Sequence, residues 1–211
     1  VGSRGVAGLT PGTSDTGTSV LTVPTNMGAG LFWLIAKADG AGALGEPNEY
    51  NNTRYAAVRI GPDLPLTALA APAIAGPGTT INVTETTANQ GAGNAAGSST
   101  RFYLSANFSL DATDRALGAH SVGALIPGAS TPGVTTVAIP TDVSGGTYYL
   151  IAAADDGNAV PESTETNNTR FVTVRVGPDL YVATSGSPTR AAPGTTIALT
   201  ETTKNSGGGG A

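Results

Sequence analysis

Acidic side chains gather in one short stretch of the sequence, at a spacing that could bind a cation. The candidate ligands are Asp155, Asp156, Asn158, Glu162 and Glu165, and an earlier stretch carries Asp39, Glu46 and Glu49 in the same order. Calcium prefers several carboxylate and carbonyl oxygens from flexible loops, so each stretch is a candidate calcium site. The alternative is structural, because the same side chains can fold a long hairpin loop by bonding to nearby backbone groups.

A second candidate calcium loop contains Asn107, Asp111 and Asp114, together with the backbone carbonyl of Ser109. Its spacing only loosely resembles a calcium-binding loop, and it lacks the Glu that usually binds the ion through both oxygens. It is therefore a weaker candidate than the first stretch.

Residues suited to catalysis are scarce. A nucleophile needs a base beside it, and the single histidine, His120, is expected to be an exposed strand residue. Glu85 and Glu201 lie among apolar neighbours, where a buried lone carboxylate would be costly. We expect a bulge or an edge position to bring each to water, or else a partner such as an arginine. Aromatic residues, which wall most sugar-cleaving clefts, make up only 5% of the chain. The sequence predicts a protein that is not an enzyme.

Four Asn-x-Ser/Thr sequences offer candidate glycosylation sites, at Asn51, Asn82, Asn107 and Asn167. Chance is a sufficient account of them in a chain so rich in Thr and Asn. Glycosylation would nevertheless fit a protein of the cell surface.

The chain is acidic and carries few charges. Its formal net charge is −5, and its 10 Lys and Arg do not cluster. Nucleic-acid binding needs a basic stripe, and an anionic membrane surface attracts basic clusters, so neither is an expected partner. No stretch approaches the roughly 18 apolar residues of a membrane span. Without cysteine, disulfide frameworks, thiolate zinc sites and a cysteine nucleophile are excluded.

One long repeat dominates the sequence. The motif Gly-Pro-Asp-Leu at 61–64 returns at 177–180, an offset of 116 residues, and at this offset 43 of the 95 aligned pairs are identical without a gap. We therefore expect three parts. Residues 1–60 are the C-terminal half of one β-sandwich repeat, residues 61–176 a complete repeat, and residues 177–211 the N-terminal strands of a following repeat.

The complete repeat consists of short alternating segments separated by Gly, Pro, Asn and Asp, and no segment keeps a helical period. We expect seven strands, near residues 64–70, 79–87, 99–105, 117–126, 134–139, 147–154 and 170–176. This number of short strands is typical of an immunoglobulin-like sandwich. The predicted fold class is all-β, with tandem immunoglobulin-like antiparallel β-sandwich repeats of about 116 residues.

One expected strand is apolar on both faces. Residues 147–154 carry Tyr149 and Ile151 on the face opposite Tyr148 and Leu150, and Trp33 and Ile35 correspond to the first pair in the earlier copy. Either these side chains stay exposed, or the outer face packs on another chain, because exposed apolar patches mark contacts.

Several motifs of the complete repeat together indicate a family. They are Gly-Pro-Asp-Leu at 61–64, Asn-Gln-Gly at 89–91, Phe-Tyr-Leu-Ser at 102–105 followed by Asp111 and Asp114, Gly-Thr-Tyr-Tyr-Leu at 146–150, Ala-Asp at 154–155 and Glu-Ser-Thr-Glu-Thr-Asn-Asn at 162–168. With these motifs the repeat resembles the bacterial cell-adhesion-related domain, CARDB. The resemblance implies a β-sandwich strung in tandem on secreted or cell-surface proteins, with an adhesive or structural role and no catalytic residues. Ala106-Asn107 stands where the family often has an acidic residue, which weakens any metal role of that loop.

The leading functional hypothesis is a structural repeat module of an extracellular stalk, adhesin or filament. Its expected partners are neighbouring repeats or copies of itself in a fibre, and its expected location is extracellular or at the cell surface. Residues 1–60 and 177–211 together supply all of one repeat except the equivalents of 96–116. The chain is thus either part of a longer array or able to polymerise head to tail by completing split domains.

The alternative hypothesis is a calcium-dependent, carbohydrate-binding module attached to a secreted enzyme, with surface glycans as partners. It predicts an aromatic platform or an open calcium site on one face.

Overall fold

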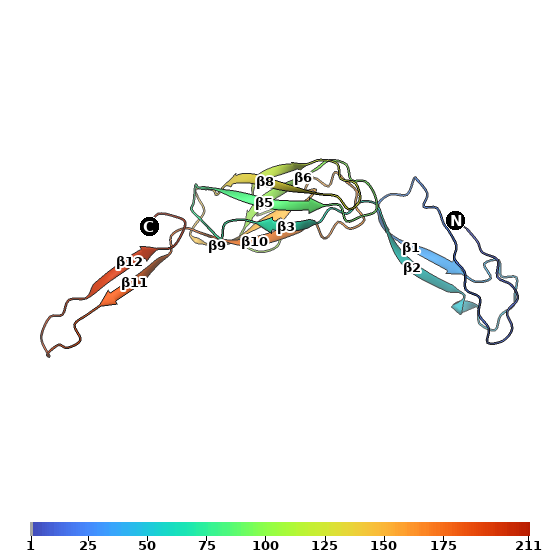
Figure 1. Ribbon diagram of the computed structural model, residues 1–211, viewed down its shortest axis with the longest axis horizontal. Coiled ribbons are helices and arrows are strands. Elements are labelled where there is room, and N and C mark those ends of the chain that lie inside the picture. The colour runs from blue at the N-terminus through green and yellow to red at the C-terminus, as the bar shows by residue number, and fades with distance from the viewer. Residues whose placement is uncertain (1) are drawn as a thin grey trace.

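The computed structural model describes residues 2–211, whose regular structure is almost entirely β (Figure 1). We call residues 2–60 the head. It contains a first hairpin of β1 (Gly30–Lys37) and β2 (Thr53–Ile60), and the connection between them includes the short 3-10 turn η1 (Glu49–Asn51). We call residues 61–176 the central domain. Its strands are β3 (Leu66–Ala70), β4 (Ile74–Ala75), β5 (Thr80–Ala88), β6 (Ser98–Ser105), β7 (Arg115–Val122), β8 (Ser130–Ala138), β9 (Gly146–Ala153) and β10 (Thr169–Val176). The tail, residues 177–211, contains β11 (Leu180–Gly186) and β12 (Thr200–Asn205).

The central domain is a sandwich of two sheets. One sheet has the strand order β4-β10-β9-β6-β7 and the other β3-β5-β8. All pairings are antiparallel except the short one between β4 and β10. The expected all-β sandwich is therefore confirmed, and each of the seven expected strands is present. In the described residues 2–211, no helix has the length and apolar character needed to cross a bilayer.

Two strand boundaries differ from those expected. The fourth expected strand starts earlier and ends at Val122, because beyond the following glycine only Leu125 still pairs, in an isolated bridge with Ala95. The fifth begins at Ser130 and includes Pro132. Proline has no N–H to donate, and β8 tolerates it because β8 is the edge strand of the three-stranded sheet.

The apolar core lies between the two sheets. Buried and less buried residues alternate along β5 and β8, as expected for strands that are buried on one face, whereas β9 is buried on both faces from Leu150 to Ala153. The largest fully buried side chains include Phe102, Leu150, Val83, Val137 and Val174. A smaller cluster around Leu64 lies at the start of the domain, and it anchors the chain where the head joins.

The hairpins of the head and the tail repeat pairings of the central domain. β1 and β2 pair from Gly30–Ile60 onward, in the register of β9 and β10, which pair from Gly146–Val176 onward. β11 and β12 pair with the register of β3 and β5, and both pairs shift register at the same position, between Val182 and Thr184 and between Leu66 and Ala68. The division of the chain into three parts stays a prediction.

The two hairpins differ from the central domain in burial. Leu150 is fully buried in the central domain, whereas its equivalent Leu34 in the head is 45% exposed. Val83 is fully buried, whereas its equivalent Leu199 in the tail is 66% exposed. Within residues 2–211 neither hairpin has a second sheet packed on its apolar face, and the two leave the central domain at opposite ends (Figure 1).

Candidate functional site

The most elaborate polar arrangement of the chain lies at the joint between the head and the central domain. Asn89, fully buried after β5, accepts hydrogen bonds through Oδ1 from the backbone amides of Asp63 (3.2 Å) and Gly91 (3.1 Å). Its Nδ2 donates to the carbonyls of Gly93 (2.8 Å) and Leu125 (2.9 Å). One side chain thus ties the first residues of the domain to two of its loops.

Glycines are needed where these segments touch. A Cβ at Gly91 would lie 2.5 Å from the carbonyl carbon of Pro62, which only a glycine avoids. Gly61 has φ of 107°, in the region that glycine adopts without a steric penalty. The Gly-Pro-Asp-Leu motif therefore reflects the close approach of the backbone of residues 61–63 to the loop at residues 91–93.

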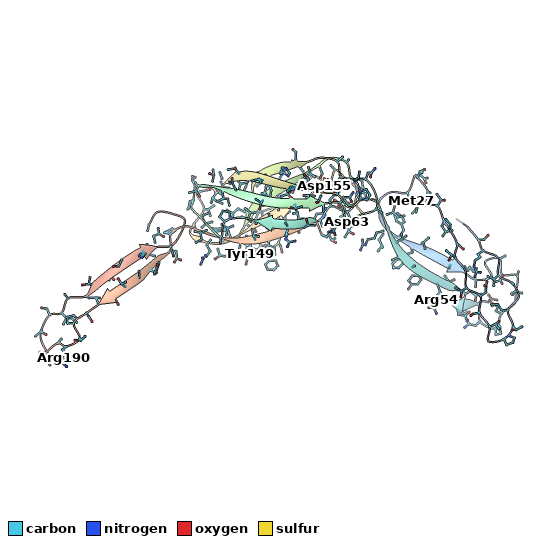
Figure 2. All side chains as sticks on the ribbon, in the orientation of Figure 1. Met27, Arg54, Asp63, Tyr149, Asp155 and Arg190 are labelled. Carbon is cyan, nitrogen blue, oxygen red and sulfur yellow. The ribbon has the colours of Figure 1, made fainter. Side chains whose placement is uncertain are left out.

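The other side of the joint is formed by the loop between β9 and β10. The Glu162 carboxylate accepts hydrogen bonds from the backbone amide of Leu64 and from Asn168 Nδ2 (3.0 Å). Asn167 Nδ2 donates to Asp63 Oδ1 over 2.9 Å. Asp63 and Asp155 both lie at the end of the central domain that faces the head (Figure 2). The Glu-x-x-Glu-x-Asn-Asn motif therefore fixes the start of its own domain.

The acidic loop is held by its own carboxylates. Asp155, at a positive φ of 44°, accepts from the backbone amides of Ala159 (3.2 Å) and Val160 (2.8 Å). Glu165 accepts from the amide of Glu162 at 2.8 Å. These bonds are of the kind that the structural alternative expects, in which the side chains fold the loop through nearby backbone groups.

The remaining members of the loop point elsewhere. Asp156 accepts from the Tyr103 hydroxyl (2.6 Å) and lies 3.2 Å from Arg101 Nε, and burial and the bond to Asp156 raise the pKa of Tyr103. Asn158 has a positive φ of 47° and donates its amide to the Asp155 carbonyl over 2.7 Å. Asp156 is therefore engaged with β6, away from the Asp155 carboxylate.

The head has the same loop arrangement. Asp39 accepts from the amides of Leu44 and Ala43, both at 2.9 Å, and these bonds lower the pKa of Asp39. Glu49 accepts from the Glu46 amide at 3.0 Å. Two copies of one sequence pattern thus fold into the same hydrogen-bonded loop.

The second candidate calcium loop is also internally bonded. Asp111 accepts from the amide (2.8 Å) and hydroxyl (2.6 Å) of Thr113, which lower its pKa, and Asp114 accepts from the Asp111 amide at 2.8 Å. Asn107 accepts from the Ser109 amide at 2.7 Å. Across residues 2–211 no group of three or more His, Cys, Asp or Glu is arranged to hold a metal ion. Calcium binding at either loop stays a prediction.

Glu162 gives the joint a dependence on pH. Burial raises the pKa of Glu162 to about 7 against the bond from the Leu64 amide, and the negative Glu165 and Asp155 add to the rise. A folded-state pKa above the ordinary 4.5 means that folding takes up a proton between these two values. The contribution is complete below pH 4.5 and is lost as the pH rises through about 7.

We expect the free energy of unfolding of the central domain to fall by about 2 kcal/mol between pH 5 and pH 8. Urea unfolding at several pH values measures this slope. Glu162→Gln should flatten it, whereas Asp142→Asn, at an exposed carboxylate 2.5 Å from Arg115, should leave it unchanged. An unaltered slope in Glu162→Gln would contradict the assignment.

The structure corrects the expectation for Glu85. It is neither at an edge nor in water: it is 2% exposed, in the middle strand of the three-stranded sheet. Its partner is not an arginine but His120 of β7, whose Nδ1 lies 2.8 Å from Glu85 Oε1. The Thr87 hydroxyl donates to the other oxygen over 3.0 Å.

His120 is likewise half-buried and paired, not an exposed strand residue. Gly133 makes room for the pair, because a Cβ there would lie 2.7 Å from Glu85 Oε1. Sequence reasoning missed this contact because β7 and β5 are in different sheets, although the carboxylate among apolar neighbours signalled that a partner was needed.

The candidate glycosylation sites differ in accessibility. Asn51, Asn82 and Asn107 are exposed, whereas Asn167 is half-buried and uses its Nδ2 in the joint. A glycan on Asn167 would attach to the same nitrogen that donates this hydrogen bond. Modification of any of the four stays a prediction.

Aromatic rings line the outer face of β9 and β10 and of the equivalent β1 and β2; Phe171, Trp33 and Tyr55 are exposed, whereas Tyr149 is half-buried. Tyr149 and Phe171 meet edge to face with centroids 5.5 Å apart, and Phe108 lies 6.1 Å from Phe171. Trp33 and Tyr55 of the head, at the equivalent positions, meet edge to face at 5.2 Å. Figure 2 shows Tyr149 pointing away from the sandwich. The head thus repeats the central pair on its own hairpin.

The two facing sheets of the central domain define an immunoglobulin-like β-sandwich module. The family model described as CARDB matches residues 61–172, and the chain belongs to that family, as the sequence motifs indicated. The family is one of non-catalytic, surface-associated β domains.

Several solved structures are similar to the chain. A CARDB domain of a Pyrococcus furiosus protein, crystallised in complex with di-metal ions, is 22% identical over 55% of this chain and 89% of its own, with a TM-score of 0.43. A domain assigned to a cell surface protein of Methanosarcina acetivorans is 25% identical over 56% of this chain and 93% of its own, with a TM-score of 0.42. A β-glucosidase of Listeria innocua is 13% identical and is covered over only 16% of its length, with a TM-score of 0.38. No curated protein matches the chain.

Proposed function

We propose that this chain is a structural module of an extracellular stalk, adhesin or filament, in which sandwich domains are spaced end to end and perform no catalysis. The observation that carries the proposal is the joint. The same Asn89 that closes the central domain also fixes Asp63, the third residue after the head. Since β2 runs through Gly61 directly into that clamp, the preceding domain is held to the next with almost no linker.

Contacts across the joint support restricted bending. Arg59, in the last strand of the head, donates through Nη1 to the Ser163 carbonyl (2.8 Å) and to Thr164 Oγ1 (2.7 Å) of the central domain. Pro62 fixes one backbone angle between the two units, and its carbonyl accepts from the Ser163 amide at 2.7 Å. A spacer needs such joints, because free hinges would let the array collapse.

The location and partners follow from the same role. A chain of spaced sandwiches serves outside the cell or at its surface, and the contacts of each module are with neighbouring repeats or with further copies of the chain. The absence of cysteine leaves stability to the apolar cores and to the polar joints.

Small-angle X-ray scattering tests the spacer role. We expect chains with one, two and three copies of residues 61–176 between head and tail to gain the same maximum dimension with each added copy. Alanine at Arg59 and at its equivalent Arg175 in every central copy, together with Pro62→Gly in every copy, should blur this increment, because these substitutions loosen each joint. Increments that shrink with copy number would show a collapsed array and contradict the proposal.

A second function, binding of surface glycans, is favoured by the aromatic pairs. Edge-to-face packing leaves a ring face free, and aromatic rings offer stacking surfaces for ligands. A glycan array with the chain and with Trp33→Ala and Tyr149→Ala chains tests it. Binding that is lost in both variants supports the function; no binding by the parent chain contradicts it.

A further inference from the structure

The first and the last part of the central domain run side by side in the same direction. Residues 61–75, which include β3 and β4, start where the head joins and end beside Gly177, where the tail leaves at the opposite end (Figure 1). Residues 162–177, which include β10, run the same way, because β10 pairs in parallel with β4. We call these stretches the first segment and the last segment, and the contacts between them the seam.

Hydrogen bonds hold the seam at the head end. They join the Ser163 amide to the Pro62 carbonyl (2.7 Å), Asn167 Nδ2 to Asp63 Oδ1 (2.9 Å), and the Leu64 amide to the Glu162 carboxylate. All of the partners in the last segment lie in the loop that precedes β10. Because Arg59 of the head also binds the Ser163 carbonyl in this loop, a pull on the head reaches the last segment directly.

A charged side chain holds the seam farther along. Arg170, at the start of β10, donates through Nη1 to the carbonyls of Leu66 (3.3 Å) and Thr67 (3.2 Å) in β3. β10 and β3 belong to different sheets, so this contact ties one sheet to the other. Hydrogen bonds from a charged donor are stronger than those between neutral groups.

Backbone pairing holds the seam at the tail end. The first segment changes sheet there, because β3 pairs with β5 in one sheet and β4 pairs with β10 in the other. The Arg175 amide donates to the Ala73 carbonyl at 2.9 Å, and the Gly177 amide donates to the Ala75 carbonyl at 3.0 Å. The two segments are therefore fastened to one another at both ends of the domain.

This arrangement determines how tension would load the domain. In an array, tension enters at Gly61 and leaves at Gly177, so it draws the first segment toward the head and the last segment toward the tail. The two parallel segments must then slide past one another. Hydrogen bonds between strands lie across the strands, so sliding loads all of them together, whereas peeling strands apart from one end loads them one after another.

The other strands lie outside this path. β5 to β9 come between the two segments along the chain. Tension applied at the two ends of the domain therefore reaches them only after the seam has parted. The mechanical resistance of the whole sandwich depends on a few contacts between its first and its last segment.

The polar residues of the seam belong to the repeat. At the offset of 116 residues, the equivalents of Asp63, Leu64, Glu162, Asn167 and Arg170 are Asp179, Leu180, Glu46, Asn51 and Arg54. Each of these positions keeps its residue type in the second copy. The chemistry of the seam is thus a property of the repeated unit.

We infer that the central domain resists tension along the array, and that the seam between its first and last segments is the element that must be sheared before the domain unfolds under force. This inference deepens the proposed function and rests on it. A stalk or adhesin that is held at both ends is pulled along its length, and each module in it then bears the same tension.

Pulling single molecules in optical tweezers in two directions tests the inference. The chain has no cysteine, so handles can be attached at chosen sites. Ala57→Cys with Val182→Cys places the handles at exposed positions in β2 and β11 and shears the seam. Ala96→Cys with Ala124→Cys places them at exposed positions beyond the open end of the β6–β7 pair and peels that pair apart.

At one constant force, we expect the first rupture to be about a hundredfold faster in the peeling direction, since each hydrogen bond that shares the load slows rupture by up to about tenfold. Rupture of the seam should release the 116 residues of the central domain at once, up to about 400 Å of chain, which identifies the event.

A pair of proline substitutions tests the tail end of the seam. Arg175→Pro removes the amide that donates to the Ala73 carbonyl, because proline has no N–H. Under tension across the seam this variant should rupture about tenfold faster than the parent. Thr173→Pro is the matched control: Thr173 is also exposed and lies two residues earlier in β10, outside the pairing with β4. It should rupture at the parent's rate.

Two results would overturn the inference. One is equal rupture rates in the shearing and peeling directions, and the other is an Arg175→Pro chain that ruptures no faster than the Thr173→Pro chain. Circular dichroism shows whether both proline variants keep the β fold. The comparison of directions leaves the seam unaltered, so it decides the question even where a proline variant does not fold.

Failure of this inference is distinguishable from failure of the proposed function. The scattering increments of concatenated central domains measure extension in the absence of tension. Even increments together with equal rupture rates would leave the spacer role standing and remove the resistance to tension. Shrinking increments would count against the spacer role alone.

Discussion

Replacing Asn89 by alanine is expected to lower the free energy of unfolding of the central domain by about 4 kcal/mol, since several buried backbone groups lose their partner together. The fully buried amide satisfies the Asp63 and Gly91 amides and the Gly93 and Leu125 carbonyls. Alanine leaves these groups unpaired without room for enough water. Urea unfolding monitored by circular dichroism measures the loss.

The repeat supplies a matched control for this prediction. Asn205 is the equivalent residue of the tail and is exposed, so Asn205→Ala should leave the unfolding of the central domain within about 0.5 kcal/mol of the parent. Equal effects of the two substitutions would mean that burial of the clamp is not what makes it important. The comparison separates the contribution of the hydrogen bonds from the contribution of their burial.

His120→Ala is expected to cost about 3 kcal/mol, because it leaves the carboxylate of Glu85 buried without its partner. The imidazole nitrogen lies 2.8 Å from that carboxylate, which is 2% exposed. His120→Arg should retain most of the stability, since the head uses Arg4 at the equivalent position above Gly17. Thermal and urea unfolding of the three chains give the ranking.

The double variant Glu85→Gln with His120→Ala distinguishes a lost partner from lost packing. Removal of the charge should restore about half of the stability lost in His120→Ala, because an unpaired buried amide costs less than an unpaired buried charge. No recovery would show that the imidazole acts by filling space, and the stranded charge would then not be the cause.

Local sequence determined the strands and the family. Alternation of apolar and polar residues, with Gly, Pro, Asn and Asp between, placed each of the seven expected strands, because such patterns depend only on neighbours along the chain. Local sequence did not determine where the strands end. β7 ends at Val122 because Leu125 pairs with Ala95, a partner distant in the sequence. The motifs at the joint were visible in the sequence, but their task of holding the first residues of the domain was not.

For the acidic loops the sequence left two readings open, calcium binding or a self-bonded loop. The tertiary structure decided where the oxygens point: Asp155 and Glu165 accept backbone amides within a few residues of themselves. Direction of a side chain in a loop depends on backbone angles such as the φ of 44° at Asp155, and these follow from the closure of the whole loop.

By itself the sequence determined that a pattern of 116 residues recurs, that the fold is all-β and that the family is CARDB. Only the tertiary structure decided that Glu85 is buried and meets His120, and that Arg4 covers a glycine in the same way. The reason is that periodicity records which face of a strand a residue occupies, whereas the partner across the core depends on how two sheets are packed.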